Sequence, residues 1–122
     1  QHIMVAGYKH KPPVGTPGSG MITVTLKSDT LEVSGDFEEL TSNFYGAYIM
    51  VSLKGHSGNQ LYTLNAELND AKTGGVLKAE NNSFKLSEAE LKLLKNGELF
   101  INISSYDHKT GELRGDISPM GK

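Results

Sequence analysis

Short stretches in which apolar and polar residues alternate make up most of the chain. In residues 21–26 and 30–34 every second side chain is apolar, the periodicity of a β-strand with one buried face. The segment from Lys27 to Asp29 between them is typical of a hairpin turn, so these strands are predicted to pair antiparallel. Six further strands are predicted at residues 3–7, 47–53, 61–68, 76–80, 99–104 and 112–117. Short strands separated by turns indicate an all-β fold, an antiparallel β-sandwich or barrel.

One segment departs from this alternation and carries the signals of a short helix. A capping box, a hydrophobic staple and a C-terminal stop surround it, formed by Ser87 with Glu90, Leu86 with Leu91, and Asn96 with Gly97. A helix is therefore predicted at residues 88–95. We expect it to cover one open end of the sandwich, with Leu91 and Leu94 facing the core and Ala89 completing the apolar stripe.

Length and charge narrow the class of protein. The chain has 122 residues, which favours a single domain spanning residues 1–122. Its net charge is only −2 and no run of Lys or Arg is present, so neither nucleic acid nor an anionic membrane is expected as a partner. The absence of cysteine excludes disulfides and thiolate zinc sites. The longest apolar stretch, near residues 47–53, falls far short of the about 20 residues that span a bilayer.

The histidines do not form a metal-binding pattern. They are His2, His10, His56 and His108, all in predicted termini or turns. No two stand two apart on a strand or four apart on a helix, so structural or exposed roles are favoured and no metal or other cofactor is predicted. His108 is a weak candidate ligand, together with Asp107 or His56. Tyr48 and Met50 share one strand face, where a packing pair is favoured over a copper(I) site.

No catalytic residues are predicted. The chain has no GxSxG nucleophile elbow, and its histidines are not spaced to act as a general base. Glu38 and Glu39 are adjacent and would point to opposite sides, so a solvated edge is expected rather than a carboxylate pair. The glycine-rich residues 15–20 lack the Lys-Ser/Thr of a phosphate loop and are expected to form an extended bend.

Glu112 and Arg114 lie two apart on the last predicted strand and so share one face. Arg114 is expected to pair with a carboxylate of a neighbouring strand and hold the sheet edge. Residues 114–116 also spell RGD, but a strand position does not suit integrin recognition. Asn81 and Asn102 each begin an N-glycosylation pattern; Asn81, in a polar loop, is the candidate for modification, whereas Asn102 lies in a strand.

Four segments of the chain together resemble one known family. They are residues 12–24 (PPVGTPGSGMITV), 31–42 (LEVSGDFEELTS), 93–103 (LLKNGELFINI) and 111–115 (GELRG). In this order and spacing, over most of the chain, they resemble the chordin-type (CHRD) domain, an all-β module of secreted animal proteins and exported bacterial proteins. The resemblance implies an immunoglobulin-like or Cu/Zn superoxide-dismutase-like topology. It also implies a structural signature of Pro12, Pro13, Gly35, Asn102, Glu112, Arg114 and Gly115.

The chain departs from this family where members carry imidazoles. Members typically have His-x-His on one strand and a third His on the penultimate strand, but these positions here hold Tyr48, Met50 and Ser104. His108 matches a position that is often His or Asn in the family. The chain is therefore interpreted as a divergent member without the usual histidines.

Three functions remain open. The first is a non-enzymatic extracellular module that binds a protein or matrix component, as the resemblance implies. Tyr45, Tyr62 and Tyr106 lie in or beside predicted turns and are candidates for its binding surface, or else pack at the sandwich ends. The alternatives are a copper- or zinc-binding or redox domain with a relocated site, and a self-associating structural protein. A chain beginning at Gln1 rather than Met is expected after cleavage, as in secretion, or at a chosen boundary.

Overall fold

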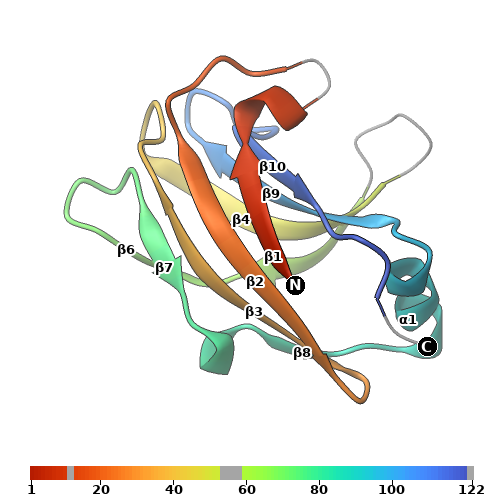
Figure 1. Ribbon diagram of the computed structural model, residues 1–122. Coiled ribbons are helices and arrows are strands. Elements are labelled where there is room, and N and C mark those ends of the chain that lie inside the picture. The colour runs from red at the N-terminus through yellow and green to blue at the C-terminus, as the bar shows by residue number, and fades with distance from the viewer. Residues whose placement is uncertain (11–12, 53–58, 121–122) are drawn as a thin grey trace.

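The computed structural model describes residues 1–10, 13–52 and 59–120 (Figure 1). Its strands are β1 His2–Ala6, β2 Ser19–Lys27, β3 Thr30–Glu38, β4 Phe44–Val51, β5 Gln60–Leu64, β6 Ala66–Leu68, β7 Gly75–Leu77, β8 Ser83–Lys85, β9 Leu99–Ser105 and β10 Leu113–Asp116. Two 3-10 turns, η1 Gly7–Lys9 and η2 Ala79–Asn81, and one helix, α1 Glu88–Lys95, complete the described part. No helix in these ranges is long and apolar enough to cross a membrane.

The strands form one antiparallel sheet that rolls into a nearly closed barrel (Figure 1). The order across the sheet is β5-β4-β9-β10-β1-β2-β3-β7-β6, and β8 pairs separately with β3. The two outermost strands of this order, β5 and β6, are consecutive in sequence and separated only by Asn65. One chain segment therefore pairs with both ends of the sheet, β5 with β4 and β6 with β7. The predicted all-β antiparallel fold is confirmed.

The β2–β3 hairpin forms as predicted and is longer than predicted. Lys27 pairs with Thr30 across a two-residue loop, and pairing continues back to residues 19 and 38. Alternate side chains such as Ile22 are fully buried, as the pattern indicated. Gly35 pairs with Ile22 at a φ of +142°, where an added Cβ would meet the backbone of Met21. Backbone pairing thus extends the strands beyond the point where the apolar alternation ends.

Helix α1 has the predicted bounds and covers one end of the barrel (Figure 1). The predicted capping box at Ser87 is present, and Gly97 ends the helix in the left-handed conformation at φ +72°. Leu94 is fully buried in the core and Leu91 is half-buried against it. Ala89 is exposed. The expectation that Ala89 completes the apolar stripe is therefore wrong.

The core fills the barrel with mostly aliphatic side chains from its strands, from α1 and from a few residues beside them. Its buried members are Ile3, Val5, Ile22, Val24, Leu31, Val33, Phe37, Leu40, Ala47, Ile49, Leu64, Leu77, Leu86, Leu94, Leu99, Ile101, Ile103, Leu113 and Ile117. Because side chains alternate along each strand, the intervening residues lie on the outer face.

Three strand predictions were wrong in detail. The segment 61–68 is two strands, because the chain bends at Asn65 to leave one sheet end for the other. The predicted strand 76–80 ends at Leu77, and residues 79–81 form the 3-10 turn η2 instead. Strand β8 was not predicted, because its three residues are too few to show a strand pattern. They pair only with the start of β3. Leu53, the predicted end of the fourth strand, lies outside the described residues, as do residues 55–58 of the turn that the sequence predicts at 55–59.

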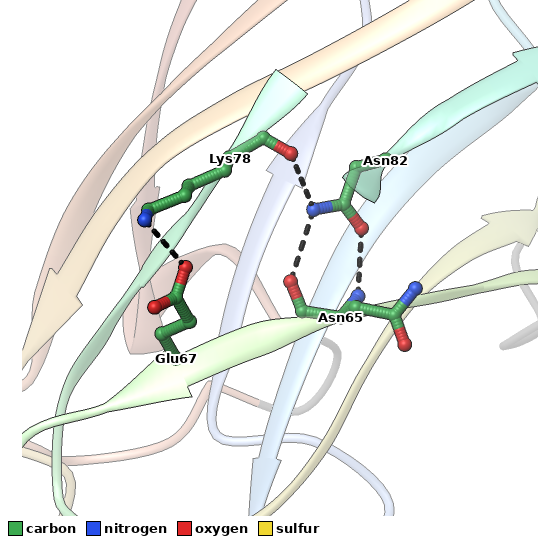
Figure 2. Close-up of polar contacts among 4 residues, drawn as sticks. All are labelled: Asn65, Glu67, Lys78 and Asn82. Atoms are coloured by element: carbon green, nitrogen blue, oxygen red, sulfur yellow. Dashed lines mark hydrogen bonds and ion pairs between the residues drawn. The ribbon is translucent and has the colours of Figure 1, made fainter. Parts of the chain in front are cut away.

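A buried asparagine holds the bend between β5 and β6 (Figure 2). The Asn82 side chain is fully buried, and its Nδ2 donates to the backbone oxygens of Asn65 and Lys78, both at 2.9 Å. The backbone N–H of Asn65 donates to Asn82 Oδ1 at 2.6 Å. An ion pair of 2.9 Å between Lys78 and Glu67 lies beside it. The buried amide thus supplies hydrogen-bond partners to the backbone of Asn65, which lies between the two strands, and its own polar atoms are satisfied in turn.

Replacing Asn82 with alanine should destabilise the barrel at its closure. The change removes three hydrogen bonds and leaves the Asn65 backbone unpartnered, so we expect a loss of about 3 kcal/mol in the free energy of unfolding. Asn81→Ala is the matched control, because its side chain is exposed, and should change stability by less than about 0.5 kcal/mol. Urea denaturation measures both. Equal stability of the two variants would contradict the role assigned to Asn82.

Candidate functional site

Three loops meet at the end of the barrel opposite α1 (Figure 1). Strand β9 begins just after α1 and runs to Ser105, so the loop that follows it lies at the far end. The loop between β3 and β4 joins it there: Tyr106 N–H donates to the Asn43 carbonyl at 3.0 Å, and Asp107 N–H to Ser42 Oγ at 2.8 Å. The loop before β2 reaches the same place through Thr16.

A buried carboxylate ties these three loops together. Glu112 is fully buried, and its Oε1 accepts hydrogen bonds from Thr41 Oγ1 at 2.8 Å and Ser105 Oγ at 2.6 Å. Its Oε2 accepts from Thr16 Oγ1 at 2.6 Å and from the Thr41 backbone N–H at 2.9 Å. Each oxygen therefore accepts two hydrogen bonds. The donors come from the loop before β2, from the loop between β3 and β4, and from the end of β9.

Hydroxyl and amide donors keep this carboxylate charged. Burial raises the pKa of Glu112, and the hydrogen bonds from Ser105, Thr16 and Thr41 outweigh that effect, so its pKa lies below the usual 4.5. No ion pair with Glu112 occurs among the described residues. Hydrogen-bond donors of the protein thus take the place of water around the carboxylate.

Arg114 is not paired as expected from the sequence. Its Nε and Nη2 both contact Oδ1 of Asp116 on the same strand, each at 3.0 Å, rather than a carboxylate of a neighbouring strand. Strand β10 lies between β9 and β1, so no sheet edge is held. Because Leu113 takes the inner face, Arg114 lies on the outer face, where its Cζ stands 3.7 Å from the ring centroid of Phe100. The RGD sequence therefore lies within strand β10, and its arginine is buried.

Two of the predicted tyrosines come together at this end. The rings of Tyr45 and Tyr106 meet edge to face, with centroids 5.2 Å apart at 80°, and the residues are 45% and 58% exposed. The ammonium of Lys109 lies 5.7 Å from the Tyr45 centroid and 5.9 Å from that of Tyr106. We call these three residues the aromatic corner. Lys109 was not singled out from the sequence; its place three residues after Tyr106 in one turn was the available signal.

Tyr62 lies elsewhere. On β5, it stacks on Phe84 with centroids 4.6 Å apart, and its hydroxyl donates to Glu90 Oε1 of α1 at 2.8 Å. Burial, and then the hydrogen bond to Glu90, raise the pKa of Tyr62 to about 12. The structure thus places Tyr62 beside the helix, at the opposite end from the aromatic corner, where it packs as the alternative interpretation held.

The remaining polar cluster lies on the outer face of β9. A Cβ on Gly111 would meet both the His10 ring and Asn102 Oδ1, so these two groups lie together at this glycine. His10 Nε2, Asn102 Oδ1 and Ser104 Oγ are buried and have no hydrogen-bond partner among the residues that the structure describes. Burial, with the charges of Arg114 and His108, lowers the pKa of His10 despite a hydrogen bond to the Leu113 backbone and the charge of Asp116. The ring is therefore held in its neutral form.

The described residues bring no metal-ligand cluster together: no group of three or more His, Cys, Asp or Glu is placed to hold an ion. His2 is exposed, with Nδ1 2.9 Å from Thr23 Oγ1, and His56 lies outside the described residues. Glu38 and Glu39 are both exposed. The absence of a metal site stays a prediction.

Comparison with family profiles gives one match. The profile of the CHRD domain covers residues 4–117, nearly the whole chain. The chain belongs to the CHRD domain family. CHRD domains are non-catalytic modules of extracellular type. Comparison with curated proteins and with solved structures returned no significant match.

Several positions of the structural signature implied by the resemblance lie in closely packed or hydrogen-bonded places, and their structural role stays a prediction. Gly35 and Glu112 are described above, and Gly115 lies where a Cβ would meet the side chains of Ile3 and Val5 at 2.6 and 2.7 Å. Pro13 is exposed, and Pro12 lies outside the described residues.

The positions where the CHRD resemblance implied imidazoles lie on the outer face. Tyr48 pairs with Asn102, and its ring lies over Gly46, which pairs with Ser104. Met50 is half-buried on the same strand face. Of the two glycosylation patterns, Asn81 is exposed at the end of η2, whereas Asn102 is only 5% exposed.

Glu112→Gln should loosen the end of the CHRD domain that carries the aromatic corner. An amide cannot accept all four hydrogen bonds and carries no charge, so we expect a loss of about 2 kcal/mol in unfolding free energy. The lowered pKa adds a pH signature: the contribution of Glu112 is present above pH 4.5 and is lost as pH falls through its folded pKa. Chemical denaturation from pH 7 to 3 measures both. The exposed Glu38→Gln should show neither effect; equal behaviour of the two variants would refute the assignment.

His10 should make the domain less stable in mild acid. Its folded pKa lies below 6.5, so below that pH the unfolded chain binds the proton more readily and the free energy of unfolding falls. Denaturation at pH 7.5, 6.5 and 5.5 should show this decline, and His10→Gln should reduce it. His2→Gln, which changes an exposed ring, is the control. A decline unchanged by His10→Gln would place its cause elsewhere.

Proposed function

We propose that this CHRD domain is a non-enzymatic, secreted module that binds a protein or matrix component through the aromatic corner. The observation that carries the proposal is the exposure of Tyr45 and Tyr106, 45% and 58%, in rings that already contact each other. Tyrosines in such a place offer large contact area at low cost in side-chain entropy. The family, whose members are extracellular modules, supports the same class of function.

The scaffold under the corner supports binding over catalysis. Ser105 precedes Tyr106 directly, and its hydroxyl is bonded to Glu112, which also holds Thr41 of the loop leading to Tyr45. The loop that carries Tyr106 and the loop that leads into β4, where Tyr45 lies, are therefore fixed to one buried group, which preorganises the surface and lowers the entropic cost of binding. Glu112 itself has both oxygens engaged, so its carboxylate is a poor general base.

Alanine substitution at the corner tests the proposal. A partner recovered by pull-down from the native extracellular milieu is purified, and its dissociation constant is measured for each variant. Tyr45→Ala and Tyr106→Ala should each weaken binding by at least about 1 kcal/mol, or roughly fivefold. Tyr8→Ala, which removes a 68% exposed tyrosine outside the corner, should leave the affinity unchanged.

Two results would overturn the proposal. One is an affinity that neither corner substitution changes by more than about 0.5 kcal/mol, the range of ordinary surface substitutions. The other is turnover of a small-molecule substrate by the purified chain, which would end the non-enzymatic assignment. Tyr62→Phe belongs in the same series. It distinguishes the contribution of the tyrosine packed beside α1 from that of the two tyrosines of the corner.

A further inference from the structure

We propose that the aromatic corner is a receptor for a cationic group, the Arg or Lys side chain of a partner protein, and that Lys109 occupies this receptor in the free domain. The inference rests on the proposed function of the corner and adds the chemistry of what it binds. It treats Lys109 as an internal stand-in for the ligand.

The position of the Lys109 ammonium shows what the corner attracts. It lies within 6 Å of both ring centroids, at 5.7 and 5.9 Å, the range in which a cation is drawn to an aromatic face. The rings meet at 80°, so together they form two walls of a corner rather than one flat face. A single charge between two tyrosine rings is the arrangement by which aromatic cages bind ammonium and guanidinium groups.

Lys109 is held in a way that allows exchange. Its side chain is exposed, and among the described residues it forms no ion pair or side-chain hydrogen bond. Both rings also remain open to solvent, so a cation of a partner reaches them without a rearrangement of the barrel. A flexible ammonium at a water-exposed site is weakly bound, and an incoming guanidinium with a larger flat surface competes with it well.

The acidic residue of the turn and the net charge of the chain favour a cationic partner. Asp107 lies between Tyr106 and Lys109 in the same exposed turn, and the whole chain carries a net charge of −2. Asp107 contributes a negative charge to this turn, which attracts a cation and repels an anion. An anionic partner would instead contact Lys109 directly. Removing the Lys109 charge would then weaken binding rather than strengthen it.

Opposite effects of the tyrosine and lysine substitutions form the test. The probe is the peptide acetyl-Gly-Arg-Gly-amide, titrated into the full chain while the ring signals of the tyrosines are followed by NMR; acetyl-Gly-Gln-Gly-amide is the uncharged control. The arginine peptide should shift the signals of Tyr45 and Tyr106 with a millimolar Kd. Lys109→Met removes the internal competitor and keeps the aliphatic stem, so it should tighten binding at least threefold.

Matched variants complete the experiment. Lys109→Arg keeps a competing cation and should bind the peptide no more tightly than the natural chain. Tyr45→Leu and Tyr106→Leu each keep an apolar side chain without an aromatic face. Each should abolish the peptide-induced shift of the tyrosine ring that remains in the corner. Lys92→Met removes a lysine of α1, at the opposite end of the barrel, and should leave the Kd unchanged.

The outcomes separate this inference from the proposed function. Weaker binding of the purified partner by Lys109→Met would show that the corner binds an anion, and weaker binding of the arginine peptide would show that Lys109 does not compete with it. Either result overturns the inference, while the tyrosine effects on the partner keep the proposed function. Absence of ring shifts with the arginine peptide also overturns it. If the tyrosine substitutions change neither peptide nor partner binding, both the inference and the proposed function fail.

Discussion

The arrangement of the functional end of this barrel depends on one buried carboxylate. Glu112 has no arginine or lysine beside it among the described residues, and donors from Thr16, Thr41 and Ser105 replace the water it loses on burial. Stranding a buried charge costs several kcal/mol, so the loops that bring these donors cannot move away without unfolding that end. The carboxylate therefore fixes loop positions that the short loop sequences do not determine themselves.

Asn82 plays the corresponding part at the closure of the barrel. A strand that leaves one sheet end for the other must break its hydrogen-bond ladder at the bend, and the freed backbone groups of Asn65 are hydrogen-bonded to the Asn82 amide. In both places a single polar side chain, fully buried, satisfies backbone or hydroxyl groups from distant parts of the chain. The aliphatic core supplies the driving force for folding, and these two residues determine how the strands and loops are joined.

The two ends of the barrel have different characters as a result. At one end α1 covers the core, and Tyr62 is absorbed into packing with Phe84 and Glu90. At the other end Glu112 holds the loops beside the corner, and Tyr106 and the β4 residue Tyr45 are exposed to solvent. A rigid frame under exposed aromatic rings suits recognition by contact, which is the function we propose for this CHRD domain.

The sequence by itself determined the features that depend on near neighbours. Alternating apolar residues gave the β2–β3 hairpin, and Ser87 and Gly97 gave the bounds of α1, because strand periodicity and helix caps act within a few residues. The tertiary structure alone decided the break at Asn65, the pairing of Arg114 with Asp116, and which tyrosines meet. Tyr45 and Tyr106 are far apart in sequence, and Tyr62 carries the same local signals. Only the packing of β4 beside β9 brings the first two together and leaves the third against the helix, because contacts between distant segments depend on how the whole sheet closes.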